Sequence, residues 1–254
     1  MRRFRIHSIV AAVLIWGSTA HYVQASPINT RPHVPGGGLS DLQAVFDSLH
    51  VSGPGIDAET GQLPYAWFDN TASGGAVATF VIELASFSDS NAFGIYSVLD
   101  PSKKAEIFSG ATAQGSQALI SFLSDGTIKV NGVTVATGFA DYFGFYIDVY
   151  GDDSVLDATY YSDDALNPGG SAHALIYQGD DETVIEIPGY DEGRFTDDEF
   201  IVAFEDGLPP GNDSNVFTDL VVLVESIEHV PAPGAAVLAL IGSGMIGWIR
   251  RRNG

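Results

Sequence analysis

A loop near the end of the chain, between Phe204 and Leu220, carries oxygen-bearing side chains at close spacing. Its carboxylates are Glu205, Asp206, Asp213 and Asp219, and its amides are Asn212 and Asn215. Calcium takes about six to eight oxygen ligands, which Asp, Asn and carbonyl groups in a turn can supply. We therefore expect a candidate calcium site here, with charge from the carboxylates and neutral oxygen from the amides.

The same loop also fits a second interpretation, an acidic surface turn without a ligand. Asn and Asp are common in turns because their side chains bond the local backbone, and the loop lacks the EF-hand spacing of calcium ligands. A second acidic region could likewise bind a cation or face water, and we expect it to face water. It comprises Asp148, Asp152, Asp153, Asp157, Asp163, Asp164 and Asn167.

No arrangement of nucleophile and base in the sequence identifies a reaction. The chain has no cysteine, no Gly-x-Ser-x-Gly motif and no glycine-rich phosphate loop. The histidines are scattered without zinc spacing, and we expect His173, at the start of a strand, to be structural. Carboxylate pairs are too common here to identify a glycosidase, whose acid needs a raised pKa. We expect a non-catalytic protein, and a hydrolase of matrix polymer is the minor alternative.

One helix and many short strands must position these side chains. Leu42, Val45, Phe46 and Leu49 recur at helical spacing after Ser40, the predicted N-cap. Beyond Gly53 the period becomes two, and segments rich in Val, Ile, Phe and Tyr alternate with turn residues. Strands are predicted at 78–86, 92–99, 106–109, 117–123, 127–130, 133–136, 144–150, 158–161, 173–178, 183–187, 199–204 and 220–227. This pattern is typical of an antiparallel β-sandwich, with a type I′ hairpin at Asn131-Gly132.

Both ends of the chain are apolar and flanked by arginine. Arg2, Arg3 and Arg5 precede an apolar stretch, and Val23-Gln24-Ala25 fits a cleavage site after Ala25, so that the mature chain begins at Ser26. At the other end, Val230-Pro231-Ala232-Pro233 leads into an uncharged run from Gly234 to Ile249, followed by Arg250, Arg251 and Arg252. Such a run favours the bilayer, and the arginines keep to the cytoplasmic side. A buried core helix is the alternative interpretation of this tail.

These features divide the chain into a signal peptide at 1–25, a linker at 26–38, a β-sandwich domain at 39–229 and a sorting tail at 230–254. All 32 acidic residues lie between the two apolar ends, together with only five of the 11 basic ones, so this segment has a formal charge of −27. Such a charge repels nucleic acid and attracts divalent cations. Without cysteine, the exported domain must be stabilised by its core, which a bound metal can assist.

The order of motif, apolar run and arginine cluster over residues 230–252 resembles the PEP-CTERM sorting signal. Ala232 stands where that signal has its name-giving Glu. The resemblance implies a precursor anchored in the inner membrane by its tail. It also implies two processing partners, a signal peptidase and an exosortase, an integral membrane protease that cuts near the Pro-x-Pro motif. The product would lie at the cell surface or outside the cell, in bacteria that make exopolysaccharide and biofilm.

The middle of the chain resembles an exported bacterial domain of unknown function, the one called forty-one fourteen. The resemblance rests on residues 92–96, 143–147, 161–167, 173–175, 202–206 and 219–222, in that order. It implies a jelly-roll-like sandwich, in a family that recurs beside calcium-dependent modules. Where that family often has Asp and Asn in the acidic loop, this chain has Val216 and Thr218.

We therefore expect an exported, acidic β-sandwich sorted to the envelope or extracellular matrix, with an adhesion or scaffolding role stabilised by calcium. The alternative function is a carbohydrate-binding module for exopolysaccharide, with aromatic side chains stacking on sugars. Its candidate aromatics are Trp67, Tyr65, Tyr96, Tyr160 and Tyr161, although aromatic residues in a sandwich usually belong to the core.

Overall fold

The computed structural model describes residues 39–64, 67–71, 75–83, 91–110, 112–139, 142–151, 153–207 and 217–230. The predicted signal peptide at 1–25, the linker at 26–38 and the apolar tail after Val230 lie outside these residues. Within them, no helix is both long and apolar enough to span a bilayer.

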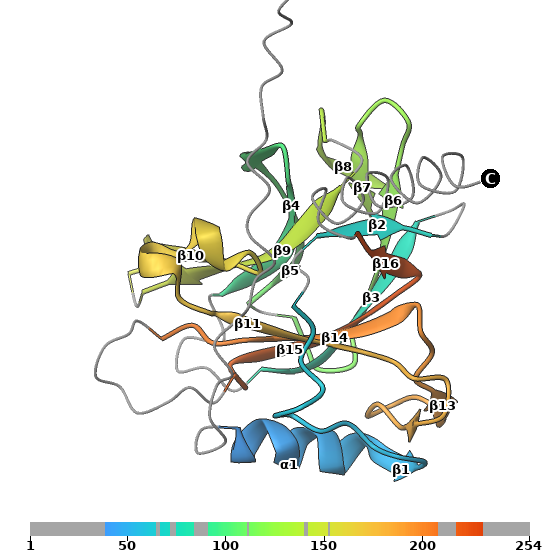
Figure 1. Ribbon diagram of the computed structural model, residues 1–254. Helices are drawn as coiled ribbons and strands as arrows, with labels where there is room; N and C mark the ends of the chain where they lie inside the picture. The colour runs from blue at the N-terminus through green and yellow to red at the C-terminus, as the bar shows by residue number, and fades with distance from the viewer. Residues whose placement is uncertain are drawn as a thin grey trace, which may run out of the picture.

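The described residues form a mainly β structure of antiparallel sheets with one short α-helix (Figure 1). The larger sheet has the order β11 (Ala174–Gln178), β14 (Glu199–Phe204), β15 (Leu220–Glu225), β3 (Ala76–Glu83), β6 (Gln117–Phe122), β7 (Ile128–Val130) and β8 (Val133–Ala136). The second has β16 (Ile227–His229), β2 (Phe68–Asn70), β9 (Phe143–Tyr150), β4 (Ala92–Ser97) and β5 (Asp100–Ser109), with β10 (Leu156–Tyr161) also paired to β9. A small sheet joins β1 (His50–Ser52), β12 (Val184–Ile185) and β13 (Gly193–Arg194). Two 3-10 turns, η1 (Asp164–Leu166) and η2 (Pro168–Gly170), follow β10.

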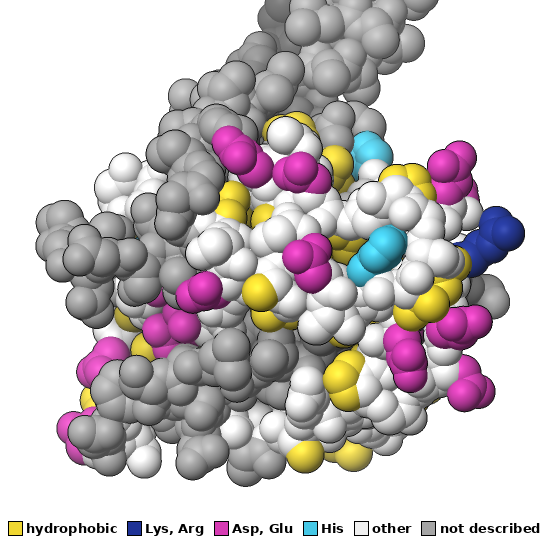
Figure 2. Space-filling model, turned by 90° about the horizontal axis from the view of Figure 1, so that it is seen from below, with side chains coloured by type: hydrophobic (Ala, Val, Ile, Leu, Met, Phe, Trp, Pro, Cys, Tyr) yellow, Lys and Arg dark blue, Asp and Glu magenta, His cyan; other side chains and the backbone are white. Residues whose placement is uncertain are grey.

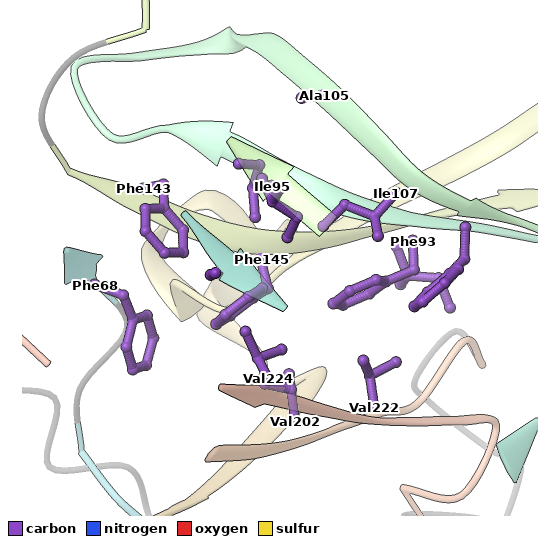
Figure 3. Close-up of a cluster of buried hydrophobic side chains, with 14 of the residues drawn as sticks. Phe68, Phe93, Ile95, Ala105, Ile107, Phe143, Phe145, Val202, Val222 and Val224 are labelled. Carbon is purple, nitrogen blue, oxygen red and sulfur yellow. The ribbon is translucent and has the colours of Figure 1, made fainter. Parts of the chain in front are cut away.

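The main core lies between the two larger sheets (Figure 3). Phe93 and Phe145 stack at 5.8 Å between ring centroids, and Phe68 packs against Phe145 at 5.1 Å. Val202 and Val222 contribute to this core from β14 and β15. The two sheets therefore pack face to face as the predicted sandwich requires.

A second core covers the other face of the seven-stranded sheet. The helix α1 (Ser40–Leu49) buries Leu42, Val45, Phe46 and Leu49, and it lies beneath this sheet in Figure 1. Phe46 meets Tyr177 of β11 edge-on at 4.8 Å between ring centroids. The central strands are thus covered on both faces, which explains why β14 and β15 are continuous apolar runs rather than alternating ones.

The structure confirms the helix and most strands, and it corrects several boundaries, among them the start of β5 at Asp100 rather than at 106. Ser40 is wrong as the N-cap, because Leu39 holds that position and no side chain caps the helix. The strand predicted at 220–227 is broken at Ser226, whose φ of 64° turns the chain from β15 into β16 in the other sheet. At the predicted hairpin, Asn131 and Gly132 have φ values of 51° and 81°, as a type I′ turn requires.

Candidate functional site

Three carboxylates of the acidic loop meet where β14 ends and β15 begins. Glu205 and Asp206 follow Phe204, and Asp219 precedes Leu220, which is the register partner of Phe204. Because the two strands are hydrogen-bonded neighbours, the ends of the loop are brought together whatever path the loop takes. We call Glu205, Asp206 and Asp219 the carboxylate cluster.

One ligand oxygen from each member of the carboxylate cluster lies within 4.8 Å of the others. The cluster is held by its own backbone: the Asp206 N–H donates to Asp219 Oδ2 at 2.8 Å, and the Gly207 N–H donates to Glu205 Oε1 at 3.1 Å. The Phe217 N–H donates to Glu205 Oε2 at 3.3 Å. These bonds fix the carboxylates close together although they carry the same charge.

The electrostatics of the cluster oppose ionisation. Burial raises the pKa of Asp206 to about 6, helped by the charge of Asp219, and burial likewise raises the pKa of Asp219 to about 6, helped by the charge of Glu205. The pKa of Glu205 is also raised, mainly by burial. Among the described residues, the positive charge that acts on Asp206 is that of His173, whose own pKa burial lowers. A positive ion would therefore be bound favourably at this position.

The surroundings of the cluster come from distant parts of the chain. Asn91, before β4, donates from Nδ2 to Asp206 Oδ2 at 2.8 Å. The ring of His173 contacts the Glu205 carbonyl oxygen through Nδ1 at 3.0 Å and stacks on Tyr160 at 3.7 Å between centroids. His173 is therefore buried and held by these contacts, as expected of a residue at the start of a strand. No sequence signal predicted that Asn91 and Tyr160 belong to this region, since both are far from the loop along the chain.

The hydroxyl of Tyr160 is buried and has no hydrogen-bond partner among the residues that the structure describes. Its pKa is raised by burial and then by the charges of Asp206 and Glu205. The hydroxyl therefore interacts electrostatically with the carboxylate cluster. A buried hydroxyl without a partner costs about 1–3 kcal/mol.

The structure brings together three of the six predicted calcium ligands. The other three, Asn212, Asp213 and Asn215, lie outside the described residues. Of the predicted sorting motif, Val230 is described, and its N–H donates to the Trp67 carbonyl at 2.9 Å. Pro231, Ala232, Pro233, Arg250, Arg251, Arg252 and the predicted cleavage site at Ala25 and Ser26 also lie outside them.

The second acidic region does not simply face water as expected. Asp148 is buried and bonded by Lys104, with Nζ at 2.6 and 2.7 Å from its two oxygens. Asp163 accepts from the Trp67 indole at 3.1 Å and from the Ala165 N–H at 3.0 Å. Asn167 Oδ1 accepts the Tyr161 N–H, and Asn167 Nδ2 donates to the carbonyl oxygens of Tyr161 and Ser171. The prediction is wrong for Asp148 and Asp163, because Lys104 and Trp67 from distant parts of the chain bond them. Asp153 and Asp157 are exposed, as the prediction requires.

The aromatic side chains proposed to stack on sugars are mostly packed inside. Tyr96 and Tyr160 are buried, and Trp67 and Tyr161 are half-buried, while Tyr65 lies outside the described residues. Tyr96 meets Tyr161 edge-on at 5.0 Å between centroids and covers Gly144, where an added Cβ would lie 2.5 Å from its ring. This glycine is therefore needed for the aromatic packing on the outer face of the six-stranded sheet.

Comparison of the chain with protein-family models, with curated proteins and with solved structures gives no match.

Proposed function

We propose that the protein is an exported, non-catalytic, acidic β-sandwich that acts in adhesion or scaffolding and binds one calcium ion at the carboxylate cluster. The observation that carries this proposal is the approach of three carboxylates, one oxygen from each lying within 4.8 Å of the others. The donors are all oxygen, which favours a hard cation such as calcium over zinc or copper.

A bound cation at the cluster would connect several parts of the sandwich. Glu205 and Asp206 extend from β14, Asp219 leads into β15, and Asn91 leads into β4 of the other sheet. A cation would also offset the repulsion that raises the pKa of Asp206 and Asp219. The role that follows for calcium is to hold this end of the sandwich together outside the cell, where the ion is abundant.

The route out of the cell is part of the same proposal and is supported by the sequence. The arginine-flanked apolar ends favour export by a signal peptidase route and processing of the tail by an exosortase-type protease. The charge of −27 between them disfavours nucleic acid as a partner and leaves an extracellular polysaccharide as a candidate.

We also propose that the sandwich is a jelly-roll variant. In both large sheets the last strand lies beside the first, β15 beside β3 and β16 beside β2. A late strand that returns to the first is the long connection of a Greek key, and a jelly roll contains two Greek keys.

Calcium binding is tested by titrating calcium chloride into chelator-treated protein in a calorimeter. We expect one ion per chain at the cluster, and we expect Asp206→Asn with Asp219→Asn to remove it. Replacing Glu186 and Glu228, which are exposed and do not belong to the cluster, by Gln removes the same charge and should leave binding intact. If the control variant loses the ion equally, bulk charge rather than the cluster binds calcium.

Export is tested by mass spectrometry of the native protein from separated cell fractions. We expect a product that begins at Ser26, lacks the arginine cluster and occurs in the envelope or medium. Recovery of the intact 254-residue chain from the cytoplasmic fraction would contradict the proposed route.

A further inference from the structure

A pocket of about 200 Å³ lies on the outer face of the seven-stranded sheet, beside the β12–β13 ribbon. We call it the outer pocket. Ile185, Leu223 and Tyr190 give it an apolar wall, and Glu199, Glu225 and Gln117 contribute polar groups. Figure 2 shows the face that α1 covers, with acidic side chains spread over it and hardly any basic ones. The outer pocket is separate from the carboxylate cluster, because none of its lining residues belongs to that cluster.

Two glutamates of the outer pocket stand directly opposite each other. Glu199 begins β14 and Glu225 ends β15, and they are register partners in the antiparallel pair. Both share the face of Ile201 and Leu223, which belong to the second core. Like charges directly opposite each other on neighbouring strands are destabilising. The repulsion between Glu199 and Glu225 therefore destabilises the fold, and a positively charged ligand would reduce this repulsion.

Among the described residues, no lysine or arginine forms an ion pair with either glutamate. Glu199 Oε2 accepts the Thr196 N–H at 2.6 Å. Arg194 lines the pocket, but its Nη1 donates to the Asp181 carbonyl at 3.1 Å. Burial, followed by the charge of Glu225, raises the pKa of Glu199 to about 7, and burial and Asp198 raise the pKa of Glu225.

The opposite wall of the outer pocket suits a sugar ring. Tyr190 is 39% exposed, and its hydroxyl donates to the Gly115 carbonyl at 2.7 Å, which holds the ring in place. A fixed aromatic face packs on the C–H face of a pyranose and also attracts a cation. The Gln117 amide and the Asp191 carboxylate lie at the same pocket and can bond hydroxyl groups.

We propose that the outer pocket binds an amino sugar unit of a polysaccharide, with its ammonium group at Glu199 and Glu225 and its ring against Tyr190. An ammonium group has three donors and matches two carboxylates. The volume suits one small ring, since pockets for larger ligands measure about 300–1,000 Å³.

The proposal is tested by calorimetric titration of the calcium-loaded protein with a β-1,4-linked glucosamine trimer, its N-acetylated form and the matching glucose trimer. We expect the glucosamine trimer to bind at least tenfold more tightly than the other two, because acetylation removes the positive charge. This comparison changes the ligand alone and so does not depend on how any variant folds. Equal binding of the three trimers, or no binding, would overturn the proposal.

Variants locate the ligand. Glu199→Gln with Glu225→Gln should lower affinity for the glucosamine trimer at least tenfold, and Tyr190→Ala, at an exposed position, should lower it severalfold. The Glu186→Gln, Glu228→Gln control should stay within twofold of the natural chain. If cadaverine, a linear diamine, binds as tightly as the trimer and Tyr190→Ala has no effect, the pocket recognises charge without a sugar ring and the proposal fails.

The inference does not rest on the proposed calcium site. The Asp206→Asn, Asp219→Asn variant should bind the glucosamine trimer like the natural chain even where it no longer binds calcium. If the natural chain binds calcium but not the glucosamine trimer, only the proposal for the outer pocket is refuted. If it binds the trimer but not calcium, only the proposal for the carboxylate cluster is refuted.

Discussion

In millimolar calcium the protein is expected to melt about 5–10 °C higher than in chelator. At a calcium concentration about 100 times the dissociation constant, binding to the native state adds about 2.7 kcal/mol to the free energy of unfolding. For a domain of roughly 150–250 residues, each kcal/mol shifts the melting temperature by about 2–4 °C. The shift is measured by differential scanning calorimetry, with calcium and with chelator, at one protein concentration. A melting temperature indifferent to both would contradict the calcium site.

The Asp206→Asn, Asp219→Asn variant should lose this calcium-dependent rise in melting temperature. In chelator it is expected to melt above the natural chain, because the neutral amides no longer repel each other and still accept the Asp206 N–H and Asn91 bonds. In calcium it should melt below the natural chain, because it gains nothing from the ion. A purely structural role for these carboxylates would leave the variant less stable in both solutions. The Glu186→Gln, Glu228→Gln pair controls for net charge and should keep the calcium shift.

Lys104→Met is expected to lower the free energy of unfolding by about 3–5 kcal/mol, because it leaves a buried charge without its partner. Asp148 is 6% exposed, and Lys104 bonds both of its carboxylate oxygens. Thr159 also donates to Asp148 but brings no charge. Met retains the length of the Lys side chain, so the loss reports the charge and the cation–π contact with Tyr146, whose ring centroid lies 4.5 Å from Nζ. Urea denaturation measures the change.

The neighbouring lysine provides a matched control. Lys103 pairs with Asp100 at 3.9 Å, and both side chains are about half exposed, at 41% and 47%. A surface pair of this kind contributes about 0–1 kcal/mol, so Lys103→Met should cost far less than Lys104→Met. Adding Asp148→Asn to Lys104→Met should restore part of the loss, because the buried group is then neutral and Thr159 can still bond it. Equal costs for the two lysine variants would show that the Lys104–Asp148 pair is not buried in solution.

The local structure could be predicted from the sequence, and so could half of the candidate site. The helix follows from Leu42, Val45, Phe46 and Leu49, whose spacing places them on one face. The β-strands follow from short apolar runs between turn residues. Glu205 and Asp219 were predictable as neighbours because they flank one loop between two adjacent strands. These features depend on residues close along the chain, where periodicity and turn chemistry act.

Contacts between distant segments were decided by the tertiary structure alone. The pairing of Glu199 with Glu225 depends on strand register, and a shift of one residue would turn one of them to the other face of the sheet. The contacts of Lys104 with Asp148 and of Asn91 with Asp206 join different strands and loops of the sandwich. The sequence does not distinguish a solvated carboxylate from a buried one. Only the packing of the surrounding segments decides whether a given carboxylate is buried. The sequence by itself thus determined the acidic loop and the β-sandwich class. The packing of the two sheets and the helix decided which of the many carboxylates became desolvated and clustered.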